Sequence, residues 1–187
     1  FAHIPERVGY LGEMRYGLLT RRWPNPPRHS RGSMVAHYLA LAQDSVGEPI
    51  QTPPRPQLQA PADTSLLDTL GLAPQSYTLL VPGAEYGPAK RWPVAHFAAL
   101  IGQLPHPAVL LGSPKEHDLC AEIQQLSGVA NVRNLAGSTS LGDAIALIAN
   151  AHSMVSNDSG LMHVAAAFDI PQVAVFGSSS PLHTPPL

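Results

Sequence analysis

The stretch Tyr77-Thr78-Leu79-Leu80-Val81-Pro82-Gly83 decides the fold expected for this chain. A short apolar run that ends in proline and glycine is typical of a buried strand leading into a turn. Similar runs lie at residues 108–111, 153–156 and 172–176, with a weaker one at 131–135. Segments with helical spacing separate them. This alternation predicts βαβ units around a Rossmann-like parallel sheet of the α/β class.

The segments between these strands carry helix signals. We expect helices over residues 93–104, 114–126, 141–151 and 160–168, and another over 33–44 before the sheet. Pro93 and Pro114 suit a first helical position, where the N–H that proline lacks is not needed. Ser113 and Glu116 match a capping box.

Five prolines between residues 49 and 61 divide the chain. Proline fixes φ and removes a hydrogen-bond donor, so we interpret residues 49–75 as an interdomain linker. Residues 1–48 are too few to bury a core alone, and residues 76–187 hold the predicted sheet. Because the chain begins with Phe1 and stops soon after residues 172–176 without a closing helix, we expect it to be a piece of a longer protein, incomplete at both ends.

The composition indicates an ordinary globular protein, with 187 residues, 44% of them hydrophobic, and a formal charge of −2. We expect a cytoplasmic protein, since there is no run of eighteen apolar residues and no signal-peptide pattern. The single cysteine, Cys120, cannot form an internal disulfide and is expected to be buried. Six of the eleven basic residues fall within the first 31, which suits an anionic partner or a solvated surface. Without interleaved aromatic residues, no nucleic acid is expected.

Ligands of open α/β sheets bind beyond the carboxyl ends of the strands, and three loops there carry candidate residues. The loop after the first strand, residues 82–93, has two glycines followed by Lys90 and Arg91, just before a predicted helix. Either cation could neutralise the charge on a leaving diphosphate, and the other would then be merely solvated. The Walker A pattern is absent, and two glycines alone are weak evidence.

The loop after residues 153–156 reads Asn157-Asp158-Ser159-Gly160-Leu161-Met162-His163 and opens a predicted helix. Free N–H groups at a helix N-terminus favour phosphate, and His163 could donate to the same oxygens. Helix capping by Asp158 or Ser159, and simple packing of His163, explain these residues equally well. In the third loop, Glu116 could accept hydrogen bonds from ribose hydroxyls, although capping competes with that role.

Other chemistries lack their motifs. The nine histidines form no metal-ligand pattern, and no G-x-S-x-G elbow is present. The first predicted strand is not followed by G-x-G-x-x-G. We therefore expect no metal and no nicotinamide or flavin cofactor.

Taken together and in this order, these loops resemble the ADP-heptose:lipopolysaccharide heptosyltransferases, above all their type II branch. Four runs carry the resemblance: residues 82–93 (PGAEYGPAKRWP), 156–167 (SNDSGLMHVAAA), 9–19 (GYLGEMRYGLL) and 179–187 (SSPLHTPPL). The resemblance covers nearly the whole chain and is weakest through the proline-rich segment.

The resemblance implies an inverting glycosyltransferase of the GT-B arrangement, in which two Rossmann-like domains face a cleft. Residues 76–187 would be the C-terminal ADP-sugar domain, and residues 1–48 a remnant of the acceptor-side domain. The donor would be ADP-heptose, and the acceptor a lipid-linked lipopolysaccharide inner core, with peripheral contact to the inner membrane allowed. Lys90 would contact the diphosphate and Glu116 the ribose. The phosphates and the nearby sugar would be bound by Asp158, Ser159, Gly160 and His163.

The catalytic base implied by the resemblance matches no residue of this sequence. Two other readings therefore stay open. The chain by itself could bind ADP or an ADP-sugar without transferring heptose, or the parent protein could be a sugar-nucleotide epimerase with the same two-domain architecture.

Overall fold

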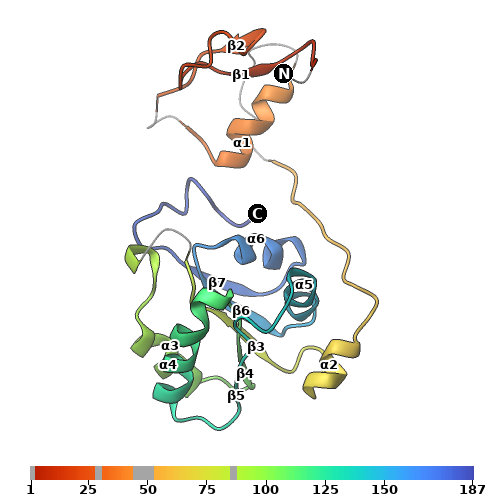
Figure 1. Ribbon diagram of the computed structural model, residues 1–187, viewed down its shortest axis with the longest axis vertical. Coiled ribbons are helices and arrows are strands. Elements are labelled where there is room, and N and C mark those ends of the chain that lie inside the picture. The colour runs from red at the N-terminus through yellow and green to blue at the C-terminus, as the bar shows by residue number, and fades with distance from the viewer. Residues whose placement is uncertain (1–2, 28–30, 44–52, 85–87) are drawn as a thin grey trace. The chain divides into compact units, whose positions relative to one another are not determined.

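The computed structural model describes residues 3–27, 31–43, 53–84 and 88–187. The chain forms two compact units (Figure 1). The first unit consists of residues 1–54 and 181–185, and the second of residues 55–180 and 186–187.

The second unit is built on a five-stranded parallel sheet, as the alternating pattern predicts. Its strand order is β5-β4-β3-β6-β7, with β3 (Thr78–Val81) in the centre. The other strands are β4 (Ala108–Leu110), β5 (Val132–Asn134), β6 (Ser153–Asn157) and β7 (Gln172–Val175). All pairings are parallel, and each strand lies within one or two residues of its predicted range. After β3 the chain adds β4 and β5 on one side of it and then β6 and β7 on the other. The topological switch point therefore lies at the carboxyl ends of β3 and β6.

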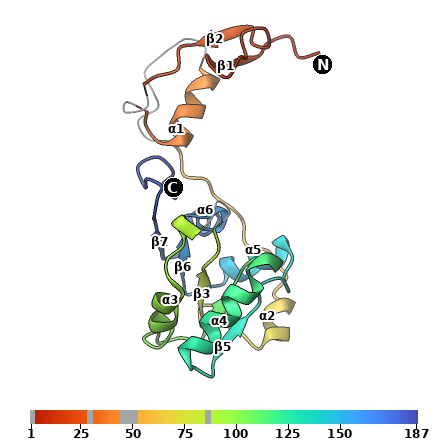
Figure 2. The same ribbon diagram turned by 60° about the vertical axis from the view of Figure 1, so that its left-hand side comes forward.

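Helices cover both faces of this sheet, as Figures 1 and 2 show. On one face, α3 (Val94–Ile101) and α4 (His117–Ser127) bury Phe97 and Ile123 against Leu80 of β3. On the other face, α5 (Leu141–Ala149) and α6 (Gly160–Ala167) bury Leu147 and Met162 against alternate strand residues. The strict alternation of Leu79 and Leu80 between the two faces follows from the two-residue period of a strand.

Two predicted helix starts differ from the structure. Pro93 is not the first helical residue but the N-cap, with an extended ψ of 142°, and α3 begins at Val94. Pro114 opens a short 3-10 turn, η4 (Pro114–Glu116), and α4 follows from His117. The capping box of Ser113 and Glu116 is confirmed.

The segment interpreted as a linker contains packed structure. Helix α2 (Ser65–Leu70) ends at Gly71 in the left-handed conformation, and Leu67 is 1% exposed in the same core as α5. The packed part of the second unit therefore begins before residue 76. Residues 53–64 have no helix or strand, although the Leu58 amide donates to the Ala167 carbonyl.

The first unit contains elements that the sequence analysis does not identify. Two three-residue parallel strands, β1 (Val8–Tyr10) and β2 (Arg21–Trp23), pack their aromatic ends against the helical segment. That segment comprises α1 (Met34–Leu39) and the 3-10 turn η2 (Ala40–Ala42). The last residue of the helix predicted over 33–44 lies outside the described residues.

Cys120 is fully buried on α4, as expected. Burial, with a smaller contribution from the nearby Glu116 carboxylate, raises the pKa of its thiol to about 12, so the thiol stays protonated at neutral pH. Within the described ranges, no helix is both long enough and apolar enough to cross a bilayer.

Candidate functional site

The three loops identified from sequence meet at the carboxyl edge of the sheet. The loop after β3 is tied to the loop after β6, because Lys90 and Trp92 both bond to residues there. The loop after β4 reaches the same place, since a Cβ on Gly83 would lie 1.6 Å from Oε1 of Glu116. This cluster lies at the topological switch point, where ligands of open α/β sheets bind.

Asn157, at the end of β6, holds the loop after β3 at both of its ends. Its Nδ2 donates to the Pro82 carbonyl at 2.6 Å, and its Oδ1 accepts from the Trp92 amide at 2.9 Å. Asn157 is fully buried. An amide is suited to this place because it donates and accepts at once. This role of Asn157 was not predicted from the sequence, where the available signal was a polar residue at the end of a predicted strand.

We expect Asn157→Ala to lower the free energy of unfolding by about 1–3 kcal/mol, because it leaves two backbone groups without their partner. Denaturant titration of the purified chain measures this. Asn150→Ala is the matched control, since the Asn150 side chain donates one hydrogen bond, to the Ala146 carbonyl, and its loss should cost less. Equal losses in the two variants would contradict the role given to Asn157.

Lys90 and Asp158 form an ion pair at the centre of the cluster. Nζ of Lys90, at the end of the 3-10 turn η3 (Pro88–Lys90), lies 2.7 Å from Oδ2 of Asp158. The two side chains are 23% and 9% exposed, so solvent screens the pair less than a surface pair. Burial alone would raise the pKa of the Asp158 carboxyl, but hydrogen bonding, chiefly from Lys90, and the positive charges nearby lower it.

No side chain in the described part of the chain caps the N-terminus of α6. Ser159 occupies the N-cap position, yet its hydroxyl makes no capping bond, and Asp158 turns to Lys90 instead. The capping explanation for these two residues is therefore wrong. Among the described residues, no side chain bonds to the first N–H groups of α6 at the positive end of its dipole, which is the arrangement that binds phosphate.

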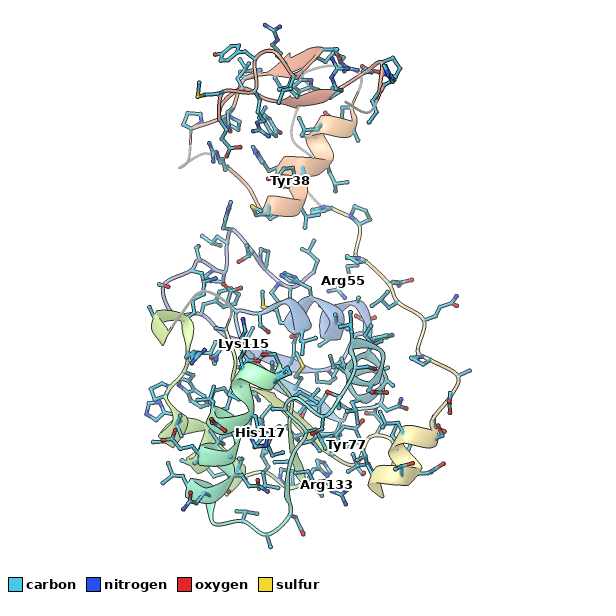
Figure 3. The ribbon with its side chains drawn as sticks, in the orientation of Figure 1. Tyr38, Arg55, Tyr77, Lys115, His117 and Arg133 are labelled. Carbon is cyan, nitrogen blue, oxygen red and sulfur yellow. The ribbon has the colours of Figure 1, made fainter. Side chains whose placement is uncertain are left out.

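Glu116 serves as a cap and also faces the cluster. Its Oε2 accepts from the Ser113 amide at 2.7 Å, while its carboxylate lies against Gly83. Lys115 and His117, labelled in Figure 3, flank it at the start of α4. A Cβ at position 83 would overlap this carboxylate, so any other residue there would force the Glu116 side chain to move. Glu116 is thus fixed beside the loop that carries Lys90.

The remaining candidates lie at the same edge. His163 is exposed one turn into α6 and contributes to the low pKa of Asp158. Gly160 is exposed at the first position of that helix, and a Cβ there would meet nothing within 4 Å. Arg91 is exposed and has no hydrogen bond or ion pair to another described residue.

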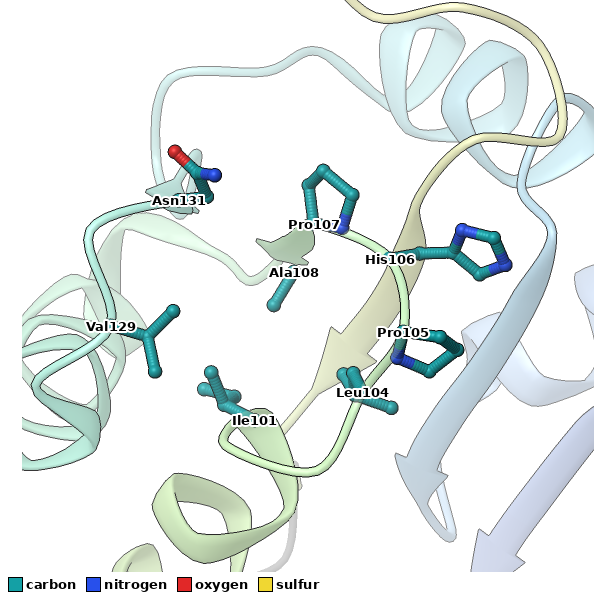
Figure 4. A pocket seen from close by; sticks show the side chains of 8 residues that line it. All are labelled: Ile101, Leu104, Pro105, His106, Pro107, Ala108, Val129 and Asn131. Carbon is teal, nitrogen blue, oxygen red and sulfur yellow. The ribbon is translucent and has the colours of Figure 1, made fainter.

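A pocket of about 180 Å³ lies at the opposite edge of the sheet (Figure 4). Its lining is mostly apolar and includes Ile101, Pro107 and Val129. Ala108, which also lines it, is the first residue of β4, so this pocket faces the amino ends of the strands. It is separate from the cluster at the carboxyl edge.

Known proteins resemble this chain over its whole length. The model of glycosyltransferase family 9 (heptosyltransferase) matches residues 1–187. The lipopolysaccharide heptosyltransferase 2 of Salmonella typhimurium is 44% identical over all of this chain and 58% of its own length. The lipooligosaccharide heptosyltransferase 2 of Haemophilus influenzae is 38% identical over the same shares.

Solved structures give the same result. E. coli ADP-heptose lps heptosyltransferase II matches with a TM-score of 0.81 and 40% identity, over 98% of this chain and 60% of that one. A glycosyl transferase family 9 structure from Veillonella parvula, 23% identical with a TM-score of 0.75, shares the fold. The chain spans about three fifths of the length of the relatives it matches. The resemblance noted from sequence is confirmed: the chain belongs to glycosyltransferase family 9, the heptosyltransferases.

Proposed function

We propose that this chain provides the ADP-heptose site of an inverting glycosyltransferase. The whole enzyme would transfer L-glycero-D-manno-heptose to the heptose of the lipopolysaccharide inner core. One observation carries the proposal: the Lys90 ammonium lies on Asp158 in front of the uncapped N-terminus of α6, at the switch point of a parallel sheet.

These groups suit a departing diphosphate. When the bond between the anomeric carbon and the phosphate oxygen breaks, negative charge grows on ADP. The Lys90 ammonium can bind that charge directly, and the N–H groups of Ser159 and Gly160 can donate to the phosphate oxygens. We assign the ribose hydroxyls to Glu116, whose carboxylate is already fixed beside the Gly83 loop. His163 is the further donor toward the phosphates and the sugar.

The proton of the acceptor hydroxyl requires a base, and the carboxylates at this site are unsuited to that task. Asp158 has a lowered pKa and is ion-paired with Lys90. Glu116 accepts from a backbone amide. A general base works best when its pKa lies near the working pH, so we assign the site to donor binding and not to proton removal.

We assign binding of the acceptor to the arginine-rich first unit. The proposed acceptor is an anionic lipid-linked core, which would place the reaction at the cytoplasmic face of the inner membrane. Arg21 pairs with Glu6 at 2.7 Å and Arg15 with Glu13 at 3.5 Å, while Arg22 lies over the Tyr16 ring. Arg22 has no acidic partner among the described residues, and it is the arginine we assign to the acceptor.

Calorimetry on the 187-residue chain tests the proposal. We expect weak but measurable ADP binding, with AMP weaker, because Lys90 and the N-terminus of α6 would contact the diphosphate. The same preparation should show no heptose transfer from ADP-heptose to an inner-core acceptor. Equal affinities for ADP and AMP would overturn the diphosphate assignment. Transfer by this chain would mean that the base lies within it.

A further inference from the structure

The loop that follows β7 closes against the Lys90 loop. A Cβ on Gly177 would lie 2.5 Å from the Ala89 carbonyl oxygen and 3.3 Å from the Lys90 Cα. The Asp158 amide also donates to the Val175 carbonyl at the end of β7. The end of β7 and the loop after it therefore lie against the backbone of both partners of the ion pair.

Ser179, two residues beyond Gly177, brings a hydroxyl to this place. Its Oγ is buried and makes no well-directed hydrogen bond to any described residue. It nevertheless lies close enough to Asp158 to help keep the pKa of that carboxyl low. The hydroxyl of Ser159, the residue after Asp158, is also buried and has no hydrogen-bond partner among the described residues. A buried hydroxyl without a partner is costly, and such groups in native proteins call for an explanation.

We infer that Ser179 is a positioning residue of the donor site, holding the Asp158 carboxylate in place for Lys90. In the free protein Lys90 is the principal donor to Asp158. A bound diphosphate draws the ammonium toward its own oxygens, and the Ser179 hydroxyl then donates to the carboxylate that Lys90 has partly left. The buried carboxylate thereby keeps a donor, and binding does not leave it uncompensated. The inference rests on the proposed ADP site.

The serine run supplies a matched control. Ser178 and Ser179 are neighbours in one loop, but Ser178 is exposed. We expect Ser179→Ala to weaken ADP binding about three- to tenfold, the loss that corresponds to one hydrogen bond. Ser178→Ala should leave the affinity unchanged. Ser179→Thr, which keeps the hydroxyl, should restore most of the affinity.

Two further measurements separate positioning from a merely structural role. Carbon-detected NMR titration of Asp158 should show a higher pKa in Ser179→Ala than in the parent chain, and no change in Ser178→Ala. Ser179→Ala should also lose most of its effect on ADP binding in an Asp158→Asn background, because it acts through that carboxylate.

The outcomes distinguish this inference from the proposed function. If Lys90→Ala loses ADP but Ser179→Ala alters neither affinity nor the Asp158 titration, the inference is wrong and the donor site stands. If no variant changes ADP binding, the donor site is wrong, and the NMR titration still decides whether Ser179 holds Asp158. Additive effects of the Ser179 and Asp158 substitutions would overturn the positioning role.

Discussion

Lys90→Ala is expected to weaken ADP binding to this chain about 10- to 100-fold. A hydrogen bond to a charged group contributes about 1.5–3 kcal/mol, and the factor follows from the loss of one such bond to the diphosphate. The pair with Asp158 places the ammonium before binding, so the ligand does not have to order a freely moving side chain. The effect should be smaller for AMP. Isothermal titration with both nucleotides measures it.

The substitution also removes the partner of a buried carboxylate. Lys90→Met keeps the aliphatic stem and serves as a second variant, and thermal unfolding of each variant reports whether the fold has changed. Arg133→Ala, on the exposed face of the edge strand β5, removes the same charge far along the sheet from β6. An unchanged affinity in Lys90→Met, or an equal loss in Arg133→Ala, would show that Lys90 does not contact the diphosphate.

The sheet of the second unit could be predicted because its signal is local. The central strand β3 and its neighbour β4 are apolar runs buried on both faces, as strands inside a parallel sheet are, whereas the edge strand β5 carries a weaker signal. The helix starts were correct to within a few residues because prolines and the Ser113 and Glu116 pair act over a single turn. Once β3 and β6 are known to be neighbours, Lys90 and Asp158 can be placed at the carboxyl edge of the sheet.

The side-chain contacts between the loops at that edge could not be predicted from the sequence. Lys90 and Asp158 are 68 positions apart, and Asn157 and Pro82 are 75 apart. Nothing in the local pattern distinguishes an aspartate that caps a helix from one that binds a lysine of another loop. For a similar reason β1 and β2 were missed, since three-residue strands carry too little alternation and depend on contacts with α1 and η2.

Added side-chain volume in the loop after β7 should lower both the stability of the chain and its affinity for ADP. We expect Gly177→Ala to lower the free energy of unfolding by about 1–3 kcal/mol, the usual cost of overpacking. The methyl group would overlap the Ala89 carbonyl oxygen, which belongs to the backbone and cannot rotate away as a side chain could. Relief therefore requires η3 to shift, and Lys90 shifts with it.

ADP affinity should fall together with stability in Gly177→Ala, approaching the loss expected for Lys90→Ala. Gly142→Ala is the control, because Gly142 lies in α5, where a Cβ would meet only the Ser140 Oγ, at an ordinary contact distance of 3.6 Å. Alanine is favoured over glycine by up to about 1 kcal/mol within a helix, so this variant should be neutral or slightly more stable. Denaturant titration and calorimetry on the two variants give both quantities. If Gly177→Ala is destabilised but binds ADP normally, the contact with η3 supports the fold without placing Lys90. If it is neither destabilised nor weakened in binding, the loop after β7 does not press on η3.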